Sequence, residues 1–387
     1  MPKFVQSVAN QQTPPPYHFP GVTAHAFVID MQMAAVQAYC DTYFNLGDEQ
    51  ERGFVYRPFS PWPYALLMVI KYPLMINTNR TVLGLDEIPF ADRGYSSQNE
   101  VFLALPLVRH GVTPRNFLLN AALEWALPFI VVDNSTSAFS GREILGLEKL
   151  WGRIDLGTGQ FPNGFSASVE IPGWSSLDPK AMQRMRRVLH ITTGSPLPGV
   201  GHKSSVTSAW TMLESPIVLN ALQGFADAFD SLVTMSNGVI PTPMRLVALK
   251  QFRDAADPHR AIYQALVGAR SRYYDIANLT LYNEQDVTIT LDTSGSFAEI
   301  AKIFLPSTPD RRTDNLKVAI AAHAAFGFTA NLDFDEMSTL HTFLVDGDDC
   351  ASVDSGGAGM LSPWLRPWWG LINASGADPQ MPNESAS

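Results

Sequence analysis

One run of the sequence ends in a lysine that could act as a nucleophile. Residues 133–149 read Asp-Asn-Ser-Thr-Ser-Ala-Phe-Ser-Gly-Arg-Glu-Ile-Leu-Gly-Leu-Glu-Lys, so Lys149 closely follows the apolar residues Ile144, Leu145 and Leu147. A lysine amine attacks a ketone only when it is unprotonated, and burial or a neighbouring cation favours that form. The resulting protonated imine stabilises a carbanion on the adjacent carbon, which decarboxylation, aldol addition and dehydration all require. Lys149 is therefore our candidate for a catalytic amine.

Other common catalytic signatures are missing from the sequence. It contains no Gly-x-Gly-x-x-Gly, no Gly-x-x-x-x-Gly-Lys-Ser/Thr, no Gly-x-Ser-x-Gly and no His-Glu-x-x-His. The eight histidines include no pair at i,i+4, and the two cysteines, Cys40 and Cys350, are too few for a cysteine-rich metal site. We therefore predict no metal site and no cofactor.

The composition limits the class of partner. The 27 basic and 37 acidic residues give a net charge of -10, which does not favour binding to a nucleic acid. The N-terminus lacks the apolar core of a signal peptide, and the longest apolar stretch, residues 64–76, is shorter than the roughly 20 residues that span a bilayer. We predict a cytoplasmic protein that binds neither nucleic acid nor membrane.

The chain divides into three regions by composition. Residues 1–20 are rich in Pro and Gln and are predicted to form an arm on the surface or on a neighbouring subunit. Residues 21–345 form the main domain, and residues 346–387 form a tail with three tryptophans, Trp364, Trp368 and Trp369. Because exposure of three tryptophans is costly, we expect the tail to act as a structural clasp or, as the alternative, to cover the substrate.

Within the main domain, short apolar runs separated by Gly, Pro, Asn and Asp predict a mainly β fold with peripheral α-helices. A strand is expected at 23–29 and a helix after Asp30. Helical spacing or start signals also predict helices at 116–127, 298–304 and 314–323, and a helical insertion at about 175–240.

The spacing in the lysine segment resembles that of the acetoacetate decarboxylase family. In that family an Asp-Asn pair, a six-residue spacer, Gly-Arg-Glu and a lysine eight positions after the glycine follow in this order, as do residues 133–149 here. Upstream, Glu100 is followed by an apolar strand with Pro106, which is similar to the family's glutamate and proline. The family is itself a standard example of a lysine amine made nucleophilic by its surroundings.

The resemblance implies a β-barrel of the acetoacetate decarboxylase-like type over residues 21–345, with the 175–240 insertion and the tail as additions. It implies a cofactor-free lyase that acts on a small keto acid, with Lys149 as the Schiff-base nucleophile and Glu100 as the acid/base group. It also implies a homo-oligomer.

Arg142 and Glu143 are candidates for substrate binding, with a structural ion pair or a pocket wall as the alternative. For the substrate carboxylate, Lys71, Arg142 and Arg270 are the candidate partners.

The sequence also departs from the family. Where the family has a second lysine after the nucleophile this chain has Leu150, its preceding proline is replaced by Glu148, and residues 65–76 contain no acid. Side chains on an extended segment alternate, so we expect Glu148 and Leu150 to point away from the face that holds Lys149. These departures favour a broad function, decarboxylation or aldolase-dehydratase chemistry, over decarboxylation of acetoacetate itself. The alternative is a catalytically silent protein that binds a small molecule on the same barrel.

Overall fold

The computed structural model describes residues 13–345, with gaps at 61–62, 79–94, 114–121, 158–163, 174–179, 181, 198–243 and 293–316. Three predictions fall wholly or mostly outside these residues: the Trp-rich tail at 346–387, the helix at 298–304 and most of the insertion at 175–240.

The larger of two sheets contains a closed ring of strands. Seven strands pair in the order β4-β3-β1-β14-β11-β10-β5, and pairing of β4 with β5 closes the ring. Closure removes the free edges of these strands, which would otherwise expose unpaired backbone groups. In ring order the strands are β4 (Ser96–Gly111), β3 (Tyr64–Asn77), β1 (Tyr17–Asp30), β14 (Ala322–Phe334), β11 (Ala261–Tyr282), β10 (Met244–Arg253) and β5 (Ala122–Val132). The predicted β-barrel is confirmed.

Three shorter strands extend the larger sheet: β2 (Phe54–Pro58) pairs with β4, β6 (Leu150–Trp151) with β5, and β15 (Ser338–Val345) with β11. A second sheet has the order β13-β12-β9-β8-β7. Its strands are β7 (Arg153–Leu156), β8 (Ser166–Gly173), β9 (Arg184–Thr192), β12 (Thr288–Asp292) and β13 (Lys317–Ile320).

Strand β3 is buried on both faces over residues 65–70. On β3, Leu67 and Val69 belong to one buried cluster, and Leu66, Met68 and Ile70 belong to another. Alternation of side chains along a strand separates the two sets. This double burial explains why the segment reads as a nearly continuous apolar run in the sequence.

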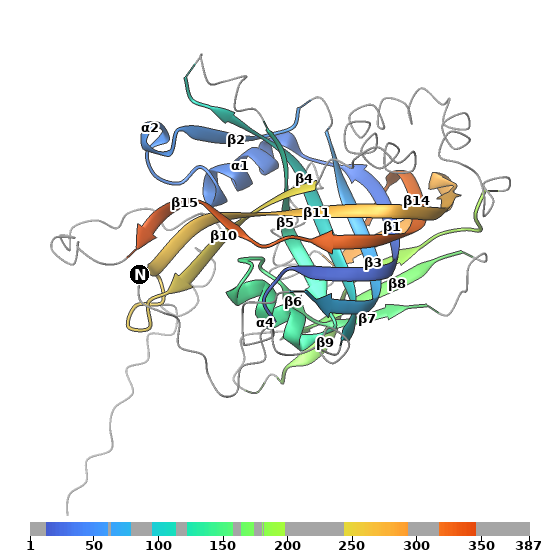
Figure 1. Cartoon of the computed structure of the whole chain (residues 1–387). Helices are drawn as coiled ribbons and strands as arrows, with labels where there is room; N and C mark the ends of the chain where they lie inside the picture. Colours follow the sequence, from blue (N-terminus) through green and yellow to red (C-terminus); the bar gives the residue numbers. More distant parts are fainter. Residues whose placement is uncertain are drawn as a thin grey trace, which may run out of the picture. The chain divides into compact units, whose positions relative to one another are not determined.

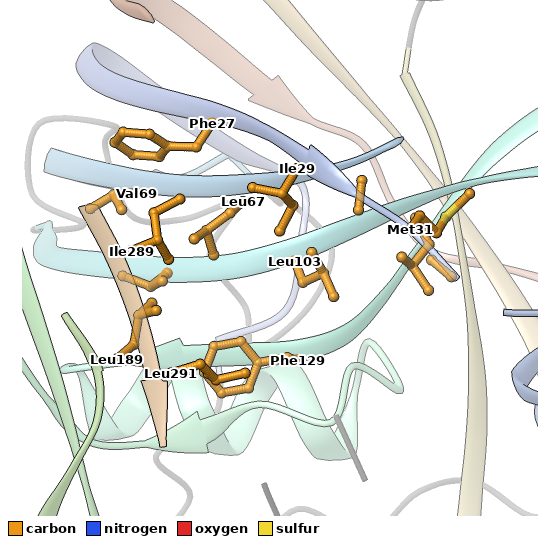
Figure 2. Packing of buried hydrophobic residues seen from close by; sticks show 14 of the residues in the cluster. Phe27, Ile29, Met31, Leu67, Val69, Leu103, Phe129, Leu189, Ile289 and Leu291 are labelled. Carbon is orange, nitrogen blue, oxygen red and sulfur yellow. The ribbon is translucent and has the colours of Figure 1, made fainter. Parts of the chain in front are cut away.

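The first cluster lies between the ring and the second sheet. Figure 2 shows Phe27, Leu67 and Leu103 of the ring beside Ile289 and Leu291 of β12. Since the second sheet packs on this face, the second cluster occupies the opposite face of the strands, inside the ring. Several side chains of this second cluster line the cavity of the candidate site.

Four short helices accompany the sheets in the described part of the chain: α1 (Met33–Tyr43), α2 (Glu49–Arg52), α4 (Ser135–Glu143) and the 3-10 helix η3 (Glu284–Asp286). Helix α1 lies beside β2 (Figure 1) and buries Val36 and Cys40 in the core. None of the described helices has the length and hydrophobicity needed to cross a bilayer.

The structure corrects several local predictions. Residues 122–127 belong to β5, 184–192 form β9 and 317–320 form β13, where we had predicted helix. In each case pairing with neighbouring strands outweighs local helical spacing, and β9 is bonded on both sides by β8 and β12. The N-cap of α1 is Gln32 rather than Asp30. Residues 17–20, which we had assigned to the arm at 1–20, belong to β1, and residues 1–12 lie outside the described part of the chain.

Candidate active site

Lys149 lies between α4 and β6, in a turn that its own sequence builds. Gly146 adopts a positive φ of 70°, which the absence of a side chain permits. The backbone N–H of Leu147 donates to the carbonyl of Gly141 at 2.9 Å, so the chain folds back along the helix. Lys149 is 7% exposed, whereas the side chain of Glu148 is exposed, as expected from alternation.

Gly141 provides the space that the stem of Lys149 occupies. A Cβ atom at position 141 would lie 2.8 Å from Cγ of Lys149 and closer still to its Cδ. Carbon atoms in contact are normally about 3.5–4.0 Å apart, so a side chain here would displace the lysine. The spacing of glycine and lysine in the motif therefore reflects direct contact between the two residues.

The Asp-Asn pair holds two parts of the site together. Both carboxylate oxygens of Asp133 accept hydrogen bonds from Asn99, one from its backbone N–H at 2.7 Å and one from its side chain at 2.8 Å. Asn134 is the N-cap of α4 and accepts from the backbone N–H of Ser137 at 3.0 Å. Asp133 thus positions the strand residue next to Glu100, and Asn134 positions the helix that carries Ser137.

Glu100 and Lys149 form a buried ion pair inside the ring. Nζ of Lys149 donates to Oε2 of Glu100 at 2.8 Å and to Oγ of Ser137 at 3.2 Å. Gln98 donates from Nε2 to the same Oε2 at 3.3 Å, and the hydroxyl of Tyr72 donates to Oε1 at 3.4 Å. An ammonium has three N–H groups, so these bonds leave one for a ligand.

The ion pair faces a mostly apolar cavity of about 70 Å³. By the same kind of measure a single water needs about 10–15 Å³, so the cavity admits more than one water molecule. Beyond Glu100, Lys149 and the residues hydrogen-bonded to them, the lining is formed by Tyr17, Phe19, Met75, Phe102, Leu127, Ile130, Ser140, Gly141, Leu145, Leu147, Met244, Leu246, Ser271, Tyr273, Leu332 and Phe334. Among the described lining residues, Glu100 is the only acid and Lys149 the only cation.

Two tyrosines in this lining remain protonated hydroxyl groups. Burial, and then the negative charge of Glu100, raise the pKa of Tyr72 well above its ordinary value. The same two causes, in the same order, raise the pKa of Tyr273. The arrangement can therefore offer an amine, a carboxylate and hydroxyl donors to one small molecule.

The fold that carries this site also occurs in solved enzymes. The structure of acetoacetate decarboxylase from Legionella pneumophila aligns with a TM-score of 0.50 and 10% sequence identity, and the alignment covers 89% of this chain and 92% of that one. The fold is that of acetoacetate decarboxylase.

A second acetoacetate decarboxylase structure gives a TM-score of 0.47 at 11% identity, covering 87% of this chain and 93% of that one. The enduracididine biosynthesis enzyme MppR gives 0.45 at 12% identity, covering 86% and 91%. No family model and no curated protein sequence matches the chain.

On this acetoacetate decarboxylase fold, the structure unites only two of the predicted site residues. Lys149 and Glu100 are in contact, but Lys71, Arg142 and Glu143 are exposed and do not line the cavity. Lys71 follows Ile70 on β3 and so points to the opposite face from Tyr72, which lines the cavity. The structure thus places these three side chains away from the cavity, and their role in substrate binding stays a prediction.

The structure bears on the alternatives given for Arg142 and Glu143, which were substrate binding, a structural ion pair or a pocket wall. Arg142 donates from Nη1 to the backbone carbonyl of Lys149 at 3.3 Å, so it supports the turn that carries the lysine. Among the described residues no ion pair joins Arg142 to Glu143. Helix α4 instead turns Ser137, Ser140 and Gly141 toward the cavity, at the i, i+3, i+4 spacing of one helix face. Arg270 is exposed and lies outside the lining of this cavity.

Sequence reasoning missed Gln98, Tyr72 and Ser137. For Gln98 a signal was available, since it lies two residues before Glu100 and so faces the same side of an extended strand. Ser137 lies three residues after the N-cap Asn134, but its direction depends on how α4 packs on the ring. Tyr72 could not be placed, because the register of β3 against β4 pairs it with Gln98 and no sequence feature specifies that register.

Proposed function

We propose that this protein is a Schiff-base-forming lyase that acts on a small keto acid, with Lys149 as the nucleophile and Glu100 as the acid/base group. The observation that carries the proposal is the buried contact of 2.8 Å between Nζ of Lys149 and Oε2 of Glu100 at the wall of an apolar cavity. The acetoacetate decarboxylase fold supports it as the architecture of a known enzyme.

The contact supplies a route for the proton that blocks the amine. Transfer of one proton from Nζ to Glu100 produces a neutral amine and a neutral carboxylic acid, and low polarity reduces the cost of losing the two charges. The amine then attacks the carbonyl carbon of the substrate, and one proton of the attacking nitrogen passes to the carbonyl oxygen, which becomes a hydroxyl. Glu100 returns a proton to that hydroxyl, water leaves, and the imine forms.

The protonated imine then accepts an electron pair from a bond at the adjacent carbon. In decarboxylation the broken bond is the one to the carboxyl carbon, which leaves as CO2, and the electron pair forms an enamine. In aldol cleavage the broken bond joins the same adjacent carbon to a hydroxyl-bearing carbon, whose hydroxyl proton passes to a base as that carbon becomes a carbonyl. Glu100, left as a carboxylate once it has protonated the departing hydroxyl, lies beside the imine nitrogen. It takes up a proton from the aldol hydroxyl, or from water in decarboxylation, and passes it to the enamine, after which water releases the product.

Borohydride trapping tests the proposal. The protein is incubated with pyruvate or acetoacetate and reduced with borohydride, and the modified peptide is located by mass spectrometry. We expect the mass of a reduced imine on Lys149, and none in Lys149→Ala. An adduct that persists in Lys149→Ala would move the nucleophile elsewhere, and the absence of an adduct with any keto acid would refute the proposal.

Lys250 offers a matched control for the trapping experiment. Burial lowers the pKa of this lysine, whose Nζ donates to the carbonyl of Ile144 at 3.0 Å, so its amine is a competing candidate for imine formation. Trapping in Lys250→Ala should equal that of the unmodified protein. The exposed Lys71 serves the same purpose for surface amines, through Lys71→Ala.

The second candidate function is that of a catalytically silent small-molecule binder. The cavity favours it in one respect, since the described lining has no second lysine, no second acid and no arginine. A binder would show a ligand-dependent rise in unfolding temperature without an adduct after reduction. Cytoplasmic location and homo-oligomer formation remain predictions, and the mass of the native protein in solution would test the latter.

A further inference from the structure

One polar atom in the cavity wall has no partner in the described structure. Oε1 of Gln98 accepts no hydrogen bond, although the residue is only 5% exposed and lines the cavity beside Glu100. A buried acceptor that gives up water without another donor costs free energy, so an unsatisfied one calls for an explanation.

The orientation of the Gln98 amide follows from its neighbour. Its Nε2 lies 3.3 Å from Oε2 of Glu100, and a carboxylate accepts hydrogen bonds. Reversal of the amide would place two oxygen atoms against each other. The carboxylate therefore keeps Nε2 turned toward Glu100 and Oε1 as the free acceptor of the amide.

No hydroxyl in the described lining donates to Oε1 of Gln98, although Ser137 and Ser140 both line the cavity. Gln98 and Lys149 both donate to the same oxygen of Glu100, so the amide lies next to the position of the reacting carbonyl. A ligand group that satisfies Oε1 must be a donor placed within a few bonds of that carbonyl.

We propose that Gln98 selects a keto acid that carries a hydroxyl group near its carbonyl, by accepting a hydrogen bond from that hydroxyl. The proposal rests on the proposed function of Lys149. A neutral hydroxyl fits this position better than an ammonium, because a second cation would compete with Lys149 for Glu100. The remaining wall, with Phe19, Phe102 and Leu332, suits an apolar remainder of the substrate.

The test compares two keto acids that differ in one hydroxyl, 4-hydroxy-2-oxobutanoate and 2-oxobutanoate. The concentration that gives half-maximal borohydride trapping on Lys149 is measured for each. We expect the hydroxylated compound to reach half-maximal trapping at a concentration about tenfold lower, equivalent to about 1.4 kcal/mol. In Gln98→Met, which keeps the length of the side chain without the amide, this ratio should fall to near one.

The ratio separates selection from mere positioning of Glu100. If Gln98 only orients Glu100, Gln98→Met slows trapping of both compounds equally and the ratio stays at its original value, which would overturn the inference. Equal trapping of both compounds by the unmodified protein would also overturn it, since a water then suffices for Oε1. Absence of any adduct would instead refute the proposed function itself. Gln264→Met, at a half-buried position on β11 outside the cavity lining, controls for the substitution, and thermal unfolding verifies that each variant is folded.

Discussion

Substitution of Gly141 by alanine provides a sharp test of the site geometry, independent of any substrate. The new Cβ would lie 2.8 Å from Cγ of Lys149, so either the lysine stem or α4 must move. Overpacking of this kind costs about 1–3 kcal/mol. Alanine is also a better helix former than glycine by about 1 kcal/mol, which offsets part of the cost.

The two effects separate in a double-mutant cycle. In Lys149→Ala the stem is absent, so Gly141→Ala should stabilise the protein by about 0.5–1 kcal/mol. In the unmodified protein the same change should be neutral or destabilising, which predicts a coupling of about 1–3 kcal/mol. Lys149→Met keeps a stem without the amine, and the coupling should persist there.

Urea-induced unfolding of the set of variants measures these free energies. A coupling near zero between positions 141 and 149 would show that the lysine stem does not lie against the glycine, and the described site would be wrong. If the coupling disappears in the Lys149→Met background, as it should in Lys149→Ala, then it arises from the charge of the lysine and not from its stem. Displacement of Nζ from Glu100 should also slow borohydride trapping in Gly141→Ala.

Three further predictions concern buried polar groups. Lys149→Met alone leaves Glu100 buried without its cation and should lower the free energy of unfolding by about 3–5 kcal/mol. The double variant with Glu100→Gln should recover most of this loss, and equal losses in the single and double variants, measured by urea unfolding, would contradict the prediction. Burial lowers the pKa of His25 to about 4, whereas the pKa in the unfolded chain is about 6.5. The contribution of the neutral imidazole to the free energy of unfolding is therefore complete above about pH 6.5, and about 3 kcal/mol of it is lost as the pH falls toward 4. This part of the acid sensitivity should be missing from unfolding curves of His25→Phe. Tyr56→Phe removes a donor 2.6 Å from Oε2 of the buried Glu124 and should cost about 1.5–3 kcal/mol in the same assay, and a cost near zero would show that the hydroxyl does not serve this carboxylate.

Several features were accessible from the sequence because they depend on local pattern. The apolar runs at 65–70 and 101–108 predicted strands, and β3 and β4 confirm them. The likeness of residues 133–149 to a known motif selected Lys149, and the separate similarity of Glu100 and Pro106 to the family's glutamate and proline selected Glu100. What the motif did not show was why its residues are spaced as they are: Gly141 makes room for the lysine that follows it by eight positions.

The remaining features depend on contacts between segments far apart in the chain. Residues 184–192 and 317–320 were predicted to be helical, but both are strands because they bond to partners that the local sequence does not specify. In the same way, whether a cation reaches the cavity depends on which face its strand or helix turns inward, so Lys71 and Arg142 lie outside. The sequence alone determined the kind of chemistry that one lysine could support, through residue type and motif spacing. Only the tertiary structure decided its surroundings, because strand register brings Gln98 and Tyr72 together beside Glu100.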